Sequence, residues 1–225
     1  MSGNNLIVNN DGRKRRITTP LIALLIAVVI SIAFASVFVY YPMAVTLQPA
    51  SPPVYFETGS NAGAYDLGGS GTPYTSNTIS VSIGSNATSL TIIVHPTYQV
   101  TYYKNVSIVY NNDGKSYKVC FRVNTPLSDL PPNSKAYLYI YSQGYARSLS
   151  DYPTPTPSGY LAQIDLTSTG TTCVGTTTFL GYNQFYEMDL YIYIPEGYNV
   201  GMTSGTTYTA NLLLIYTPQT SETPP

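Results

Sequence analysis

The pattern of apolar and polar positions divides the chain into two parts with different periods. Residues 21–41, LIALLIAVVISIAFASVFVYY, are almost continuously apolar and contain no charged residue. A helix of this length spans about 31 Å, which matches the hydrocarbon core of a bilayer. The pattern predicts one transmembrane helix at residues 17–41, with Pro20 in its first turn and Pro42 directly after its end.

Downstream of Pro42 the apolar positions alternate with polar ones, which is the period of β-strands. Met43–Leu47 is the first alternating run and predicts a first strand. Residues 49–71 are rich in Pro, Gly, Ser and Asn, and predict a linker or long loop. Further strands are predicted at 79–83, 89–95, 99–103, 106–110, 116–123, 136–141, 160–166, 176–180, 185–194 and 208–216.

The strongest turn signal in this part is Asp113-Gly114, which lies between two alternating runs. Asp-Gly suits the tight turns that connect antiparallel neighbours, so the dipeptide predicts a hairpin between 106–110 and 116–123.

Two of the predicted strands alternate aliphatic residues with tyrosine, at 136–141 and 190–194. We expect Leu138 and Ile140 to face the core, and the tyrosines to face outward or pack at the rims. Rows of tyrosines stabilise a sheet through cross-strand pairs, which is the simpler interpretation. Exposed rows can also bind carbohydrate or partner subunits.

Many short strands with Gly/Pro turns and no amphipathic helix predict an all-β fold. We expect an Ig-like or jelly-roll β-sandwich preceded by one N-terminal transmembrane helix. The predicted organisation is a cytoplasmic basic N-terminus at 1–16, a transmembrane or signal-anchor helix at 17–41, a first strand and Pro/Gly/Ser-rich linker at 42–76, an extracellular β-sandwich at 77–216 and a flexible tail at 217–225.

The basic residues set the expected orientation of this chain. Arg13, Lys14, Arg15 and Arg16 form a cluster directly before the apolar segment, and the next basic residue is Lys104. Positive charge next to a membrane segment is retained in the cytoplasm. We therefore expect a single-pass membrane protein with a cytoplasmic N-terminus and an extracellular C-terminal domain.

Charge is otherwise scarce, since Asp, Glu, Lys and Arg make up 9% of the chain, against about 25% in ordinary soluble domains. No basic patch indicates a nucleic-acid partner. The 23 tyrosines and the many Ser and Thr residues predict a hydroxyl-rich surface. A fold that depends on few carboxylates loses little stability when they are protonated, which suits an acidic or hot exterior.

Residues 16–23, RITTPLIA, resemble the leaders of archaeal type IV pilins, in which a basic stretch meets a short entry into a long apolar helix. The resemblance implies a filament subunit whose leader is cleaved, although Arg16 stands where those leaders usually have Gly or Ala. Cleavage by signal peptidase after Ala33-Phe34-Ala35 is a second possibility. Retention as a signal-anchor is a third, and is the one we favour.

A second resemblance lies near the C-terminus. Residues 194–197 and 206–210, followed by an apolar strand, are similar to the closing strands of Ig-like sandwiches in archaeal surface proteins. The low charge is similar to that of proteins from hyperthermophilic archaea and their viruses. These resemblances imply a cell-surface or virion location.

Cys120 and Cys173 both lie in the predicted exported part, where paired cysteines normally oxidise. A bridge between them would stabilise the fold by about 4 kcal/mol in the chain-entropy model. Alternation places Cys120 on the same face as Lys118 and Arg122, opposite to the apolar face. We therefore expect a bridge near the surface, either within one chain or between two subunits.

Two Asn-x-Ser/Thr triplets begin at Asn86 and Asn105, and in an exported domain they are candidate glycosylation sites. The only histidine, His95, ends an apolar run before a proline, so we expect a strand-end residue rather than a ligand or base.

Asp165, Glu187 and Asp189 are the candidates for a carboxylate pair of the kind used in glycoside hydrolysis. No metal-ligand spacing, nucleotide-binding loop or hydrolase motif accompanies them. We therefore expect no enzyme, no cofactor and no metal.

The expected function is that of a membrane-anchored, surface-exposed structural or adhesive β-domain protein, from a cell surface or a virion envelope. The alternatives are a pilus-like filament subunit and an anchored carbohydrate- or ligand-binding module. The expected partners are the lipid bilayer and further copies or other surface proteins.

Overall fold

The computed structural model describes residues 18–33, 40–66, 77–147, 149–150, 156–197, 207–219 and 221–222. The chain divides into two compact units, Met1–Pro49 and Ala50–Pro225. Among the described residues, the first unit contains the helix and the second contains the strands.

The helix of the first unit, α1, covers Thr18–Ala33 and has 16 residues. No helix among the described residues is long and apolar enough to cross a membrane. Tyr40 and Tyr41 are not helical, so the predicted helix end at Tyr41 is wrong. A residue that precedes proline is driven toward extended backbone, which explains Tyr41. Residues 34–39 and the basic cluster lie outside the described residues.

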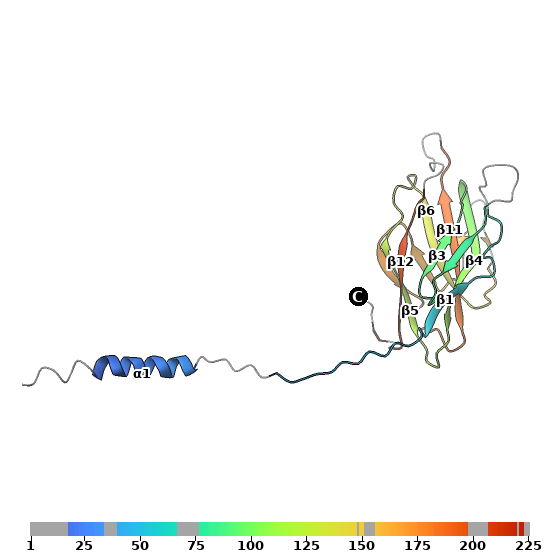
Figure 1. The fold of residues 1–225 in the computed structure, drawn as a ribbon. Coiled ribbons are helices and arrows are strands. Elements are labelled where there is room, and N and C mark those ends of the chain that lie inside the picture. The colour runs from blue at the N-terminus through green and yellow to red at the C-terminus, as the bar shows by residue number, and fades with distance from the viewer. Residues whose placement is uncertain are drawn as a thin grey trace, which may run out of the picture. The chain divides into compact units, whose positions relative to one another are not determined.

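The described residues of the second unit form two main antiparallel sheets and two short hairpins, and the expected all-β fold is confirmed (Figure 1). The first sheet has the order β1 (Val54–Thr58), β4 (Gln99–Asn111), β11 (Phe185–Ile194), β6 (Lys135–Ser142) and β9 (Ala162–Asp165). The second has the order β10 (Gly170–Cys173), β5 (Lys118–Thr125) and β12 (Asn211–Thr217). The hairpins are β2 (Ser80–Ile83) with β3 (Leu90–Ile93), and β7 (Leu149–Ser150) with β8 (Thr156–Pro157).

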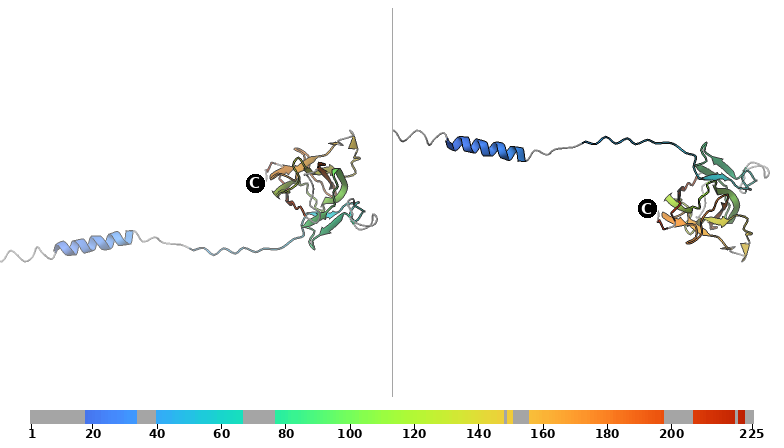
Figure 2. Two further views of the ribbon diagram at one scale, coloured as in Figure 1. Left: turned by 90° about the horizontal axis from the view of Figure 1, so that it is seen from above. Right: turned by 90° about the horizontal axis from the view of Figure 1, so that it is seen from below.

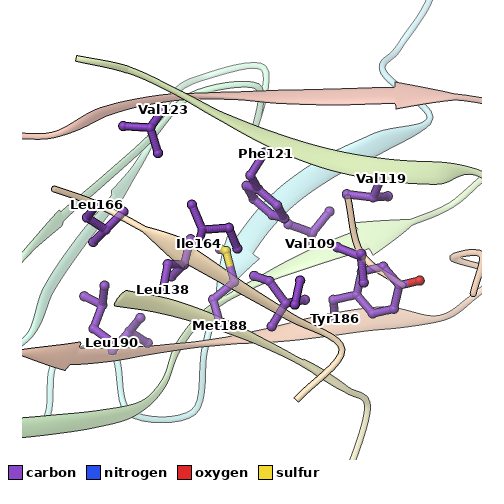
Figure 3. Close-up of a cluster of buried hydrophobic side chains, with 14 of the residues drawn as sticks. Val109, Val119, Phe121, Val123, Leu138, Ile164, Leu166, Tyr186, Met188 and Leu190 are labelled. Atoms are coloured by element: carbon purple, nitrogen blue, oxygen red, sulfur yellow. The ribbon is translucent and has the colours of Figure 1, made fainter. Parts of the chain in front are cut away.

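The hydrophobic core lies between the five-stranded and three-stranded sheets, so the unit is a β-sandwich. Phe121 and Val123 of β5 are each only 2% exposed, and they point toward Leu138 of β6 and Met188 of β11 (Figure 3). Seen along the strands, the two sheets lie on opposite sides of this core (Figure 2). Leu138 and Ile140 face inward, as their alternation predicts.

The segment between the two units differs from its prediction. Met43–Leu47 forms no strand, and residues 40–51 are all exposed. Alternation marks which residues suit a strand, but a strand also needs a partner, and this segment has none within the described chain. Conversely, β1 lies inside the predicted linker, where VYFET pairs with β4 despite its Pro- and Gly-rich flanks.

The predicted hairpin at Asp113-Gly114 is wrong. β4 belongs to the five-stranded sheet and β5 to the three-stranded sheet, so this turn carries the chain from one sheet to the other. The side-chain amide of Asn111 donates to the carbonyls of Lys115 at 2.8 Å and Leu180 at 2.9 Å. The buried Asn111 thus ties the turn to another part of the chain, which local turn chemistry does not reveal.

Most of the other predicted strands are present with shifted ends. The predicted strand at 185–194 coincides with β11, whereas 99–103 and 106–110 are one continuous strand, β4. The predicted strand at 176–180 contributes one isolated bridge, from Leu180 to Tyr117. The short strand β10 was not predicted.

The hydroxyl of Tyr186 is a polar group within the hydrophobic core. Its side chain is 3% exposed, and the hydroxyl is buried without a hydrogen-bond partner among the described residues (Figure 3). Burial raises the pKa of Tyr186 to about 12. The folded-state pKa thus lies above the ordinary value of about 10, so Tyr186 ionises more readily in the unfolded chain. Ionisation of this group therefore leaves the free energy of unfolding unchanged below pH 10 and lowers it as the pH rises toward 12.

Tyr186→Phe should therefore raise the free energy of unfolding at pH 7 by about 1 kcal/mol, since it removes a buried unpaired hydroxyl. It should also make the loss of stability between pH 10 and 12 shallower than in the wild type. Urea unfolding at pH 7, 10, 11 and 12 measures both effects. Tyr182→Phe is the matched control, because Tyr182 is 60% exposed. Destabilisation by Tyr186→Phe at pH 7, or an unchanged alkaline slope, would contradict this account.

Candidate functional site on the outer face of the five-stranded sheet

The outer face of the five-stranded sheet carries the tyrosine rows that the alternation predicts. Tyr191 of β11 lies directly opposite Tyr102 of β4 on one side and Tyr137 of β6 on the other. The rings of Tyr137 and Tyr191 are 6.0 Å apart, and that of Tyr139 lies 4.9 Å from the ring of Tyr160. The Tyr137–Tyr191 contact is a cross-strand aromatic pair, as the simpler interpretation expects. The Tyr139–Tyr160 contact joins β6 to the residues just before β9.

The burial of these tyrosines is greater than their outward direction suggests. Tyr139 and Tyr141 are 4% and 0% exposed, although they lie on the face opposite to the core. Tyr160 covers Tyr139, and Tyr145 stacks on Tyr141 at 5.6 Å. The outer face is therefore a second packed layer, built from rings rather than aliphatic side chains.

One cation lies at the centre of this layer. The side chain of Arg147 is 5% exposed and forms ion pairs with Glu187 and Asp189 of β11. Its Nε lies 3.0 Å from Oδ2 of Asp189, and its Nη2 lies 3.1 Å from Oδ1, so the guanidinium contacts both oxygens of one carboxylate. The guanidinium carbon also lies 4.6 Å from the centre of the Tyr141 ring, which is a cation–π distance.

A β-bulge explains the place of Asp189. The pairing of β11 with β4 shifts register between Met188 and Leu190, so Asp189 faces an irregular part of β4. There the backbone N–H of Asn105, a residue with φ of 45°, donates to Oδ1 of Asp189 at 2.7 Å. The Tyr102 hydroxyl donates to Oδ2 at 2.6 Å. The fully buried carboxylate thus satisfies the backbone N–H of Asn105, which the bulge removes from the ladder, and also the hydroxyl of Tyr102.

The electrostatics of the cluster follow from this burial. Burial lowers the pKa of Arg147, but the carboxylates of Asp189 and Glu187 outweigh it and hold the pKa above its ordinary value. Burial, followed by the hydrogen bond to Asp189, raises the pKa of Tyr102. Both groups therefore keep one protonation state across the range in which proteins normally operate.

The structure brings two of the three candidate carboxylates together. Glu187 and Asp189 meet at Arg147, and Glu187 also accepts from the N–H of Gly144 at 2.9 Å. Asp165 lies apart from this cluster, where it accepts from the hydroxyl of Thr167 at 2.7 Å. One guanidinium offsets one of the two negative charges, and the carboxylates are buried at 6% and 0% exposure. This arrangement suits a structural link between β11 and the loop that follows β6. Among the described residues, no group of His, Cys, Asp and Glu is arranged to hold a metal.

A shallow depression of about 310 Å³ lies beside β4 and includes Asp66 and Tyr103 among its lining residues. His95, which follows β3, donates from its backbone N–H to Oδ2 of Asp66 at 2.6 Å, and its ring Nδ1 lies 2.9 Å from the same oxygen. Burial, and next to it the Asp66 carboxylate, raises the pKa of Tyr103. His95 thus anchors the segment after a strand, as its sequence position suggests.

The two cysteines form a disulfide within the chain. Cys120 of β5 is directly opposite Cys173 of β10, so the bridge joins two neighbouring strands of the three-stranded sheet. It lies on the outer face of that sheet, as alternation predicts, yet Cys120 is only 2% exposed. The predicted bridge is confirmed, and it lies within one chain rather than between two.

The two candidate glycosylation sites lie in different surroundings. Asn86 is exposed in the turn between β2 and β3. Asn105 lies in the bulge of β4, where its side-chain oxygen is buried and its backbone carbonyl accepts from the N–H of Asn61 at 3.2 Å. Asn86 is therefore the more accessible of the two.

Sequence reasoning did not single out Arg147. It follows β6 in a loop and has no periodic pattern around it. The one available signal is scarcity, because it is one of six basic residues after Pro42 and the last in the chain. No protein-family model matches this chain, and the comparison with curated proteins finds no match either.

Proposed function

We propose that this protein is a membrane-anchored, surface-exposed structural or adhesive component of a cell surface or virion envelope. The observation that carries the proposal is the combination of an apolar N-terminal segment, an exposed connection at residues 40–51 and a disulfide-bonded sandwich. A stable folded domain that an exposed connection joins to an apolar segment suits display outside a membrane.

Three features support the proposed orientation, with a cytoplasmic N-terminus and an extracellular sandwich. Arg13, Lys14, Arg15 and Arg16 precede the apolar segment. The Cys120–Cys173 disulfide is typical of an oxidising exterior. The apolar sequence continues beyond α1 to residue 41, which gives enough length for a membrane span. The resemblance of residues 16–23 to archaeal pilin leaders supports an archaeal or archaeal-virus source.

The proposal also includes the type of sandwich, which we infer to be a jelly roll. The strands from β4 to β11 can be numbered one to eight in chain order. Strands one, eight, three and six, which are β4, β11, β6 and β9, then lie side by side in the five-stranded sheet. The second pairs with the seventh, as β5 with β10, and the fourth with the fifth, as β7 with β8. This order is that of two Greek keys, which favours a jelly roll over an Ig-like sandwich. β1 and β12 are then additions at the sheet edges.

A protease-protection experiment tests the orientation. In intact cells that express the full chain, proteinase K should cut within residues 40–51 and release the folded domain, while a tag before Arg13 stays protected. Carbonate at high pH should leave the uncut chain in the membrane fraction. Replacing the four basic residues by glutamine should give mixed orientations, because the retained positive charge is lost. A domain protected in intact cells, or a full-length chain extracted by carbonate, would reject the proposal.

A further inference from the structure

Among the described strands, β12 has the edge that is best suited to the addition of another strand. It lies at the edge of the three-stranded sheet and pairs there with β5 alone (Figure 1). Its sequence, NLLLIYT, contains no charge and no proline. Natural edge strands are usually short, charged or interrupted, because a long apolar edge invites pairing with another chain.

The inner face of β12 is incompletely covered. Leu212 and Leu214 face the core and pack against it, but both are only half-buried. Their direct neighbours across the sheet, Val123 and Phe121, are each 2% exposed. The difference follows from position, since β5 has neighbours on both sides and β12 on one. One more strand beside β12 would bring the two leucines to the burial of their neighbours.

The other sheet edges offer less. At β1, the N–H of Phe56 already donates to the carbonyl of Ala87 at 2.8 Å, so the β2–β3 turn occupies that edge. β9 and β10 have four residues each, and β10 consists of GTTC. Of the edges that the described strands form, β12, with seven residues, is the longest and most apolar.

The chain also contains a segment suited to fill such a position. Met43, Val45 and Leu47 alternate with Ala44 and Thr46, and they are 84%, 70% and 87% exposed. Proline at positions 42 and 49 brackets the segment, so its six residues are the longest run there that can donate hydrogen bonds continuously. The segment is uncharged, as is β12, and its length is close to that of β12.

We propose that residues 43–48 of one copy add as an outer strand to β12 of a second copy. Backbone hydrogen bonds along β12 would supply affinity, and Met43, Val45 and Leu47 would cover Leu212 and Leu214. The donor segment and the acceptor edge are different surfaces, so each copy can donate to one neighbour and accept from another. Such a contact is heterologous and produces open chains of copies. The inference does not depend on membrane attachment.

The test compares full-length wild-type protein with Val45→Asp and Thr46→Asp, all purified in the same detergent. Val45→Asp places a charge on the face that would be buried, whereas Thr46→Asp places it on the opposite face of the same segment. Light scattering over a concentration series should show chains of copies for the wild type and Thr46→Asp. Association of Val45→Asp should be weaker by on the order of tenfold or more. The identical helix in all three proteins controls for association through the apolar segment.

Hydrogen exchange identifies the surfaces in the same samples. Amides of residues 43–48 and 211–217 should gain protection together as the wild type associates, and stay exchangeable in Val45→Asp. Mixing unlabelled copies that carry a photo-crosslinking residue at position 44 with ¹⁵N-labelled copies should yield crosslinks to labelled residues 211–217. Crosslinks within single copies, protection of 43–48 in monomers, or edge amides of β12 already protected in monomers would each overturn the proposal. Equal association of all three proteins would also overturn it.

Discussion

Replacing Arg147 by methionine is expected to lower the free energy of unfolding by about 3–5 kcal/mol. Methionine keeps much of the side-chain volume but removes the cation that, within the described part of the chain, pairs with both Glu187 and Asp189. Both carboxylates are buried, and Asp189 is fully so. The loss comes mainly from the two carboxylates, which stay buried without a cation. In the wild type, the attraction between Arg147 and the carboxylates offsets the cost of removing these charges from water only in part.

Urea unfolding at pH 7, followed by circular dichroism, measures this effect. Arg122→Met is the matched control, since Arg122 is exposed on the three-stranded sheet and its loss should cost less than about 1 kcal/mol. Combining Arg147→Met with Glu187→Gln and Asp189→Asn should recover a substantial part of the stability. If Arg147→Met costs no more than the Arg122 control, the cluster is not a structural cross-link.

The elements that depend on nearest neighbours along the chain were predictable. β11 coincides with its predicted range, and Leu138 and Ile140 of β6 face the core as alternation requires. A period of two is a local property, so each strand reports its own buried face. The same logic placed Cys120 on the outer face of β5.

The elements that depend on distant partners were not predictable in this way. Asp113-Gly114 has the chemistry of a hairpin, but Asn111 ties the turn to Leu180, and the chain crosses to the other sheet. Met43–Leu47 alternates like a strand but pairs with no strand among the residues that the structure describes. Alternation defines which residues suit a strand, and pairing is decided by the rest of the molecule.

The candidate site shows the same division. Tyrosine rows at 136–141 and 190–194 were visible in the sequence, and their rings meet across β6 and β11. The convergence of Glu187 and Asp189 was not, because it depends on Arg147, which reaches them from a loop, and on a bulge in β4. A bulge leaves no periodic trace when the residues on both of its sides continue to alternate.

Removing the disulfide, by Cys120→Ala with Cys173→Ala, is expected to cost about 4 kcal/mol. The two residues are separated by 53 positions in the sequence. The bridge therefore reduces the number of conformations that this whole loop can adopt in the unfolded chain. For a domain of this size, the loss corresponds to a fall in Tm of roughly 8–16 °C. Thermal unfolding of the double variant and of oxidised wild-type protein measures the difference directly.

Reduction of the wild type provides the internal control for this prediction. Wild-type protein in reductant should unfold near the temperature of the double variant, whereas the double variant should not respond to reductant. Thr171→Ala, on the same short strand as Cys173, should change the Tm by only a small fraction of this amount. Because β10 has four residues, we expect its pairing with β5 to depend on the bridge, so its amides should lose protection first on reduction. Equal Tm values for oxidised wild type and double variant would show that the sheet holds β10 without the bridge.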